Sequence, residues 1–209
     1  MAGIVIAFQD FIPAKGLFGK QTWVGFQNFV FLFQLPNSFR IFWNTIYIAV
    51  MKIISGLTFP VIIALLLNEL RHKWYKRTVQ TIIYLPNFLS WVIFAGILVD
   101  ILSPGTGIIN KMLEFAGIKP IYFLGNPKWF PYTMVITDVW KNFGFSTIVY
   151  LAAITNIDPT IYEAAYIDGA NKWKQTIHVT LPGMKAIIVL VATLSLSNIL
   201  NAGFEQIFN

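Results

Sequence analysis

The chain of 209 residues is 56% hydrophobic and only 11% charged, whereas soluble domains are about one quarter charged, so the composition indicates a bilayer protein. Its net charge of +6 comes from lysines and arginines that lie mainly in short segments between apolar runs. That pattern is typical of topology signals and lipid headgroup contact, and it argues against a nucleic-acid partner. The absence of cysteine excludes disulfides and thiolate metal sites, and His72 and His178 form no ligand cluster.

The apolar runs predict an all-α, polytopic transmembrane helix bundle with a single domain over residues 1–209. The apolar stretch at 2–8 is too short to cross the hydrocarbon, which takes about 20 residues, and we interpret it as the exit end of a first span. Four full spans are predicted at about 41–67, 79–102, 132–154 and 184–204. Because apolar residues extend to both ends, we interpret the sequence as an internal piece of a longer bundle, truncated at both ends.

The densest basic segment, RHKWYKR at 71–77, predicts the cytoplasmic side of the membrane. Alternation then places 9–40 and 103–131 outside the cell membrane and the loop 156–183 in the cytoplasm. Within the second outer segment, the turn SPGTG precedes IINKMLEFAGI, whose apolar residues recur at helical spacing. This spacing predicts a short amphipathic helix that lies flat on the membrane surface.

The segment from Asp158 to Pro182 is the longest stretch between two strongly apolar runs that is not a simple turn. The pair Asp158-Pro159 predicts a helix start, and Gly169 predicts a left-handed helix stop. Residues 170–180 predict a second short helix, which the pair Leu181-Pro182 is expected to separate from the last span. Two short helices joined at a glycine suit docking into a groove of a partner. The alternative is an amphipathic hairpin that merely connects two spans.

Seven residues of this loop follow a fixed spacing, namely Glu163, Ala164, Ala165, Gly169, Val179, Leu181 and Pro182. The pattern resembles the EAA loop of bacterial ABC-importer permeases, with Val179 at a position where isoleucine is usual. The flanking strings WVGFQNF, NT, YLP and GTGIIN resemble the carbohydrate-uptake branch. The strings IVIAFQDFIPAKGLFG and GFEQIFN are similar to permeases for complex polysaccharide fragments and oligosaccharides. The resemblance covers essentially the whole chain.

The resemblance implies a type I ABC importer permease fold in the bacterial inner (plasma) membrane, and a sugar substrate. It implies two permease subunits of different sequence, two cytoplasmic ATPase subunits and an extracellular or periplasmic solute-binding protein. The helix that carries Glu163 is then the coupling helix in an ATPase groove, and Gly169 permits the elbow after it. No GxxxxGK[ST] motif occurs in the chain, so we expect the ATPase subunits to bind ATP. We expect that the permease itself is not an enzyme and needs no cofactor.

Charged and aromatic residues inside the predicted spans are candidates for the sugar path. Asp138 and Lys141 stand three residues apart on one predicted helix and can therefore pair. Trp140 and Phe143 offer faces for sugar rings. The alternative is a structural pair, or side chains that extend to the membrane surface, and for Lys52 such a structural role is favoured. The substrate-path candidates are Asn87, Trp91, Asp138, Trp140, Lys141 and Phe143.

Other functions stay open at this point. A permease with the same loop can transport an amino acid, a peptide or phosphate, because the flanking strings indicate a branch and not a solute. A membrane-embedded glycosyl or lipid transferase would need clustered carboxylates or histidines, whereas the nine acidic residues are scattered. A non-functional remnant is the third alternative.

Overall fold

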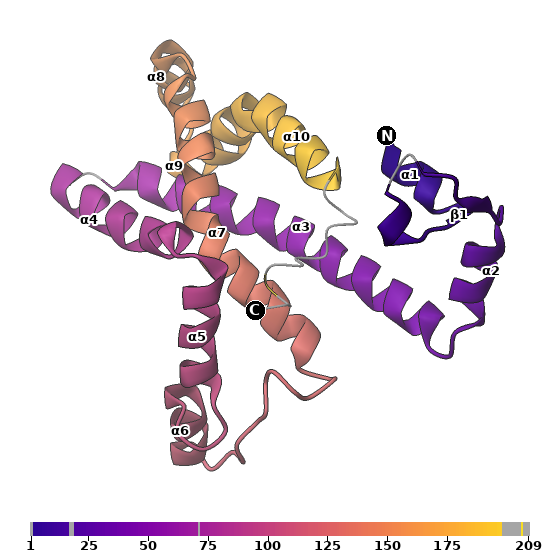
Figure 1. The fold of residues 1–209 in the computed structure, drawn as a ribbon. Helices are drawn as coiled ribbons and strands as arrows, with labels where there is room; N and C mark the ends of the chain where they lie inside the picture. Colours follow the sequence, from indigo (N-terminus) through magenta and orange to yellow (C-terminus); the bar gives the residue numbers. More distant parts are fainter. Residues whose placement is uncertain (1, 17–18, 71, 198–205, 207–209) are drawn as a thin grey trace. The chain divides into compact units, whose positions relative to one another are not determined.

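The computed structural model describes residues 2–16, 19–70, 72–197 and 206. Contacts divide the chain into two units, Met1–Thr45 and Ile46–Asn209. Figure 1 traces their elements in chain order.

The first unit is a small hairpin flanked by short helices. Its elements are α1 (Ala2–Ile6), β1 (Gln9–Asp10), η1 (Pro13–Lys15), β2 (Thr22–Trp23), α2 (Gln27–Gln34) and the first turns of α3 (Ser38–Glu69). The two strands pair antiparallel, with Gln9 opposite Trp23. The rings of Phe8, Phe26 and Phe29 lie with their centroids 5.4 to 5.8 Å apart, which is a favourable separation for aromatic pairs. The apolar stretch at 2–8 therefore forms a helix of five residues followed by a turn.

The second unit is a helix bundle, and it contains the rest of α3. Its further elements are α4 (Lys73–Tyr84), η2 (Leu85–Phe88), α5 (Trp91–Leu102), α6 (Ile108–Phe115), α7 (Phe130–Thr155), α8 (Pro159–Ile167), α9 (Lys172–Gln175), the π-helical turn η3 (Thr176–Thr180) and α10 (Leu181–Ser197). Helix α6 confirms the short helix predicted in the second outer segment. In Figure 1, α8 lies at one end of α7 and α6 lies toward the other.

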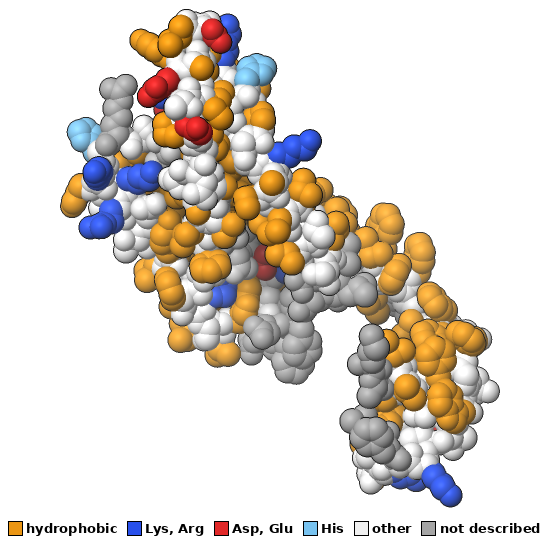
Figure 2. All heavy atoms as spheres, turned by 90° about the horizontal axis from the view of Figure 1, so that it is seen from above, with side chains coloured by type: hydrophobic (Ala, Val, Ile, Leu, Met, Phe, Trp, Pro, Cys, Tyr) orange, Lys and Arg blue, Asp and Glu red, His pale blue; other side chains and the backbone are white. Residues whose placement is uncertain are grey.

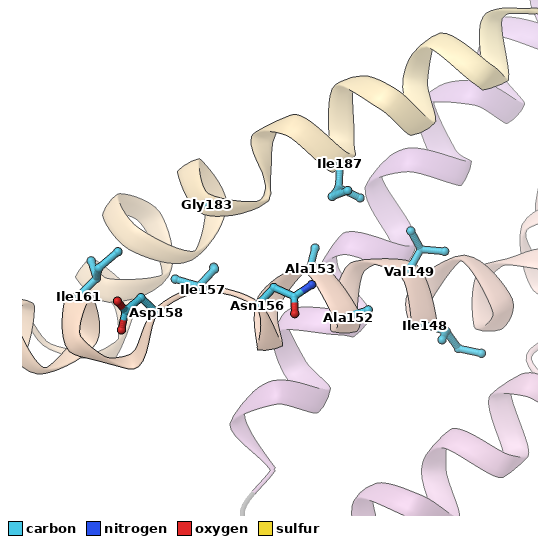
Figure 3. A pocket seen from close by; sticks show the side chains of 10 residues that line it. All are labelled: Ile148, Val149, Ala152, Ala153, Asn156, Ile157, Asp158, Ile161, Gly183 and Ile187. Atoms are coloured by element: carbon cyan, nitrogen blue, oxygen red, sulfur yellow. The ribbon is translucent and has the colours of Figure 1, made fainter.

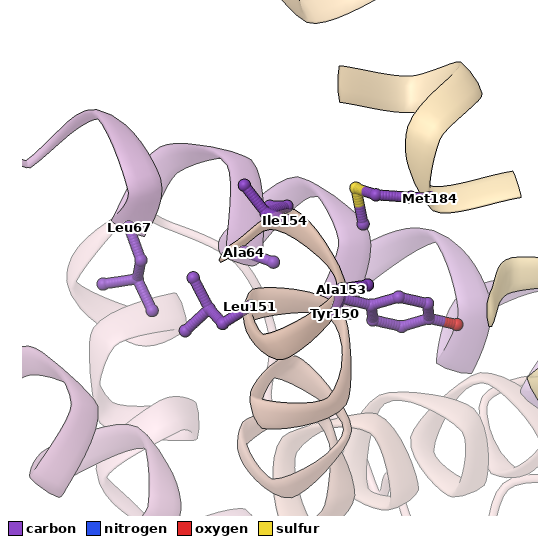
Figure 4. Packing of buried hydrophobic residues seen from close by; sticks show 7 residues of the cluster. All are labelled: Ala64, Leu67, Tyr150, Leu151, Ala153, Ile154 and Met184. Carbon is purple, nitrogen blue, oxygen red and sulfur yellow. The ribbon is translucent and has the colours of Figure 1, made fainter. Parts of the chain in front are cut away.

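Helix α7 is the centre of the bundle, since twelve of its 26 residues are buried. One group of buried side chains joins it to two neighbouring helices, as Figure 4 shows. The group consists of Ala64, Leu67, Tyr150, Leu151, Ala153, Ile154 and Met184. Helix association in a bilayer depends on close packing, because lipid tails are as apolar as the side chains. The small residues in this group allow such close approach.

Two helical segments of the described residues are long and apolar enough to cross a membrane, Ser38–Glu69 and Lys172–Ser197. They correspond to the first and last of the four predicted full spans, although residues 198–204 of the last lie outside the described residues. The third predicted span matches α7, which is long enough to cross a membrane but more polar than Ser38–Glu69 and Lys172–Ser197. Nearly half of α7 is buried against other parts of the bundle, and that part of its surface needs no apolar contact with lipid. In Figure 2, hydrophobic side chains cover much of the visible surface, as suits contact with lipid.

The second predicted span, at 79–102, is not one straight helix. Lys73–Phe88 and Trp91–Leu102 are apolar enough only together, and they bend by 105° at the break between them. Pro86 lies in η2, where its ring and missing amide hydrogen interrupt the helical hydrogen bonds. The side chain of Ser90 then caps α5, because its oxygen accepts a hydrogen bond from the amide of Ile93 at 3.3 Å. The prolyl break thus ends one helix and a new cap begins the next.

Candidate functional site

The loop between α7 and α10 begins with a side-chain cap. The carboxylate of Asp158 accepts a hydrogen bond from the amide of Thr160 at 2.9 Å, and Pro159 takes the first helical position. This backbone hydrogen bond, together with one from the Thr160 hydroxyl, lowers the pKa of Asp158 below its ordinary value. Hydrogen bonds to the charged form favour ionisation. The predicted helix start at Asp158-Pro159 is confirmed.

Helix α8 ends at a glycine elbow. Gly169 has a φ of +77°, a left-handed conformation that strains residues with a side chain. Its amide donates to the carbonyl oxygen of Tyr166 at 3.0 Å, and the amide of Ala170 donates to that of Ala165 at 2.9 Å. These two hydrogen bonds form the Schellman motif that satisfies the free carbonyls of a helix end. The predicted stop at Gly169 is confirmed.

Beyond the elbow, the chain forms one long helix. The side chain of Asn171 caps α9 by accepting from the amide of Lys174 at 2.9 Å, and α9, η3 and α10 continue as the 26-residue helix Lys172–Ser197. The expectation that Leu181-Pro182 separates a short helix from the last span is therefore wrong. A proline ring clashes with the carbonyl four residues earlier in a regular helix, and the wider π-helical turn directly before Leu181 relieves this contact.

One side-chain hydrogen bond holds α8 against this long helix, and a second one ties the long helix to the elbow. The hydroxyl of Tyr162 lies 2.9 Å from Oγ1 of Thr180, and Nε2 of Gln175 donates to the carbonyl oxygen of Ala170 at 3.2 Å. Gln175 and Thr180 are both buried. Helix α8 is therefore braced by η3 and does not project alone from the bundle.

The outer side of α8 is an exposed surface that contains Glu163. Glu163 borders a hollow of about 520 Å³ together with Tyr166, Ile167 and Lys172. Tyr166 is 75% exposed and Ile167 is 83% exposed. Large apolar side chains exposed together on one surface are typical of an interaction site. Of the seven motif residues, Glu163, Ala164, Gly169 and Pro182 are exposed, whereas Ala165, Val179 and Leu181 are half-buried.

A second hollow of about 670 Å³ lies at the root of the loop (Figure 3). Its walls come from the end of α7, from the segment before α8 and from the first turns of α10, including Gly183 and Ile187. The walls are mostly apolar, and Asn156 and Asp158 supply the polar groups. On this side α8 stands away from α7, so α9 and η3 provide its support.

Three of the substrate-path candidates, Asn87, Trp91 and Lys141, meet at the break between α4 and α5. The ammonium group of Lys141 donates to the carbonyl oxygens of Pro86 and Asn87, each at 3.3 Å, and to that of Leu89. It also lies 5.2 Å from the ring centroid of Trp91, within cation–π range. Lys141 is only 5% exposed. The ammonium group thus ties three backbone carbonyls of the break to α7.

The other three candidates, Asp138, Trp140 and Phe143, lie toward α3. The spacing predicted that Asp138 can pair with Lys141, but the structure pairs Asp138 with Lys52 of α3, at 3.6 Å between Nζ and Oδ1. For Lys52 the sequence favoured a structural or membrane-surface role over a place in the sugar path, and it did not indicate Asp138 as the partner. The two residues lie on separate helices, so no local spacing indicates the contact.

A buried glutamine completes this polar cluster. Lys52 donates a hydrogen bond to Oε1 of Gln206. Nε2 of Gln206 donates to the carbonyl oxygen of Met134 at 2.9 Å and to Oγ1 of Thr137 at 2.8 Å. Gln206 is 7% exposed, and it was not among the residues that sequence reasoning selected. Gln206 lies just beyond the last predicted span, 184–204. An amide side chain next to an apolar run is the signal that could have indicated it, because polar groups at membrane depth need partners.

Trp140 and Phe143 border a groove of about 320 Å³ between α3 and α7. The other residues of its wall are Ser55, Phe59, Ile63, Val135, Ile136 and Val139. Ser55 follows Lys52 by one helical turn, and Val135 and Val139 flank Asp138 on α7. The ion pair therefore lies beside this groove.

Residues 56–207 match the family described as binding-protein-dependent transport system inner membrane component. The chain is 42% identical over 208 residues to the polygalacturonan/rhamnogalacturonan transport system permease protein YteP of Bacillus subtilis, covering 100% of this chain and 64% of the relative. It is 28% identical over 194 residues to the arabinooligosaccharides transport system permease protein AraP of the same organism, covering 92% and 59%. The chain thus spans less than two thirds of the length of these relatives.

Two solved structures are similar to the chain. A bacterial ABC transporter involved in the import of the acidic polysaccharide alginate superposes with a TM-score of 0.86 at 41% identity, covering 97% of this chain and 67% of that one. A bacterial alginate ABC transporter in complex with an alginate pentasaccharide-bound periplasmic protein gives a TM-score of 0.83 at 42% identity, covering 87% and 63%. The all-helical permease fold predicted from the sequence is confirmed by these matches.

Proposed function

The chain belongs to the family of binding-protein-dependent transport system inner membrane components, and we propose that it is the membrane-spanning permease subunit of an ATP-driven sugar importer. Its substrates are oligosaccharides or polysaccharide fragments. The names of the two relatives and the alginate importer structures support a sugar as the solute. The partners that we infer are a second permease subunit of different sequence, two cytoplasmic ATPase subunits that bind the ATP, and an extracellular or periplasmic solute-binding protein.

The observation that carries this proposal is the bracing of α8 against the long helix Lys172–Ser197. The exposed surface around Glu163, Tyr166 and Ile167 docks in a groove of an ATPase subunit. Because Tyr162 is hydrogen-bonded to Thr180, and η3 continues into α10, a displacement of α8 also displaces α10. ATP-driven closure of the ATPase subunits then shifts the bundle between two conformations, which gives the sugar alternating access to each side.

Charge reversal at Glu163 and loss of the elbow at Gly169 test the coupling role. We expect Glu163→Lys and Gly169→Pro to abolish uptake of a labelled oligosaccharide while the protein stays in the membrane. Glu163→Lys should also prevent co-purification of the ATPase subunit. Glu114→Lys is the matched control, because it reverses an exposed charge on α6, far from the loop in the chain.

Two outcomes separate the parts of this proposal. Normal uptake by both loop variants would overturn the coupling role of α8. Co-purification of an ATPase subunit without uptake of any sugar by the unchanged transporter would keep the coupling role and overturn the substrate class. An amino acid, a peptide or phosphate would then be the solutes to test.

A further inference from the structure

We propose that Lys52 binds a carboxylate of an acidic sugar in the transport path, and that Asp138 is the resident carboxylate that this sugar replaces. The proposal rests on the proposed function and adds the charge of the substrate to it. It assigns the groove between α3 and α7 to a uronic-acid unit of an oligosaccharide.

The ion pair between Lys52 and Asp138 has a geometry that allows a ligand carboxylate to replace Asp138. Charge-assisted hydrogen bonds between ammonium and carboxylate groups are about 2.7–2.9 Å long, whereas Lys52 and Asp138 are 3.6 Å apart. The side chain of Asp138 is 25% exposed and that of Lys52 is 11% exposed. The carboxylate therefore stands on the accessible side of a largely buried ammonium group. A ligand carboxylate that approaches more closely compensates this buried charge better than Asp138 does.

The ammonium group of Lys52 stays in place without Asp138. It donates to Gln206, which is itself held by the carbonyl oxygen of Met134 and the hydroxyl of Thr137. These partners are neutral, so they position the ammonium group without cancelling its charge. A donor that is already positioned loses little conformational freedom when a ligand binds.

The groove beside the pair has the composition of a sugar site. Its volume of about 320 Å³ lies at the lower end of the range for small-molecule sites. Phe59, Trp140 and Phe143 supply three aromatic side chains to its wall, and Ser55 supplies a hydroxyl. Phe59 is 53% exposed and Trp140 is 39% exposed, so both are accessible to a ligand. Apolar walls with a few polar groups at one edge are typical of binding sites that orient a ligand.

Lys141, the buried lysine of α7, does not have this arrangement. Lys141 donates to three backbone carbonyl oxygens at the break between α4 and α5. Its position is thereby tied to the shape of that break. Lys52 instead forms an ion pair with Asp138, a carboxylate that a ligand can replace.

The test compares two probes with the same sugar rings and linkages: a trisaccharide of uronic acids, and the same trisaccharide with its charges removed by methyl esterification of the carboxyl groups. Uptake of each into proteoliposomes is measured with the complete transporter. Replacing Lys52 removes a charge-assisted hydrogen bond, so Lys52→Met should lower the acid-to-ester uptake ratio by roughly tenfold or more. The charge-balanced double variant Lys52→Met/Asp138→Asn should lower it equally. Lys52→Arg should retain the ratio, as should the control Lys111→Met on α6.

An unchanged ratio in the double variant would overturn the inference. Asp138→Asn alone gives a second test, because it leaves the ammonium group of Lys52 in place. The acid-to-ester uptake ratio should be retained or raised in this variant, and a lower ratio would also overturn the inference. Binding of both probes to the purified membrane complex without the solute-binding protein, followed by tryptophan fluorescence, separates the two proposals. Failure of all uptake counts against the proposed function, whereas equal binding of acid and ester counts against the assignment of Lys52.

Discussion

The hydroxyl of Tyr162 lies 2.9 Å from Oγ1 of Thr180, and this contact joins the middle of α8 to the last residue of η3. Thr180 is 4% exposed, so water competes little for the bond. The two residues therefore connect α8, the helix that we propose to dock, with the long helix Lys172–Ser197.

Tyr162→Phe removes this hydrogen bond and leaves the exposed side chains of Glu163, Tyr166 and Ile167 in place. We expect uptake to fall about two- to tenfold, in proportion to the net value of one hydrogen bond, while the ATPase subunit still co-purifies. Tyr122→Phe is the control, because it removes an exposed hydroxyl in the outer segment. Loss of ATPase binding together with uptake would show that Tyr162 acts in docking and not in transmission.

Close packing at Gly144 predicts a stability effect. A Cβ atom at Gly144 would lie 2.0 Å from the carbonyl oxygen of Ile83, so an alanine there forces α4 and α7 apart. We expect Gly144→Ala to lower the free energy of unfolding by about 1–3 kcal/mol, measured as a lower melting temperature in detergent. Gly96→Ala is the matched control, because a Cβ atom at Gly96 meets nothing within 4 Å. Equal melting temperatures for the two variants would contradict the prediction.

Asn110 predicts an effect confined to the outer segment. Its amide nitrogen donates to the carbonyl oxygens of Leu102, Ser103 and Ile121, each at 3.1 Å, and its oxygen accepts from the amide of Ile121 at 2.7 Å. Asn110 is 1% exposed, so Asn110→Ala leaves buried groups without partners and should destabilise this segment by about 1–3 kcal/mol. Limited proteolysis should cut residues 103–129 faster.

A control for Asn110 is the exposed cap Asn126, whose side chain accepts from the amide of Lys128 at 2.9 Å. Asn126→Ala should change the cleavage rate much less. A similar rate for both variants would show that burial of the amide is not the decisive factor.

The cap at Asp158 predicts a dependence on pH. Because the hydrogen bond from Thr160 lowers the pKa of Asp158 below its ordinary value of 3.8, ionised Asp158 stabilises the start of α8. This stabilisation is present at neutral pH and is lost as the pH falls through the lowered pKa. Hydrogen exchange of the peptide that covers α8, corrected for intrinsic rates, should accelerate in that acidic range. Asp158→Asn keeps a cap that does not titrate, so its exchange should lack the acidic step.

The local features of the loop could be predicted from the sequence, and the contacts between helices could not. Asp158-Pro159 and Gly169 act on their own backbone neighbours, so residue type was sufficient to predict the start and end of α8. The apolar spacing around Ile109 likewise predicted α6. The partner of Asp138 depends on how α3 packs against α7, and a spacing of three residues on one helix indicated Lys141 instead of Lys52.

Two corrections have a common cause. Leu181-Pro182 was expected to end a helix, and residues 79–102 were expected to form one span. A proline removes the same backbone donor in both places, but its surroundings decide the result. The π-helical turn before Pro182 lets the helix continue, whereas at Pro86 the chain turns by a large angle and Lys141 donates to the carbonyl oxygens of the break.

Because the helix Lys172–Ser197 is uninterrupted, a small movement of the loop can produce a larger movement at the other end of the helix. In the described residues no break divides this helix between α9 and α10, so its two ends can move together as one rigid element. Its 26 residues span roughly 39 Å at 1.5 Å per residue, so a tilt of about 10° at the Lys172 end moves the far end by about 7 Å. Under the proposed coupling role of α8, a small rotation at the loop thereby becomes a much larger displacement at the other end of this helix.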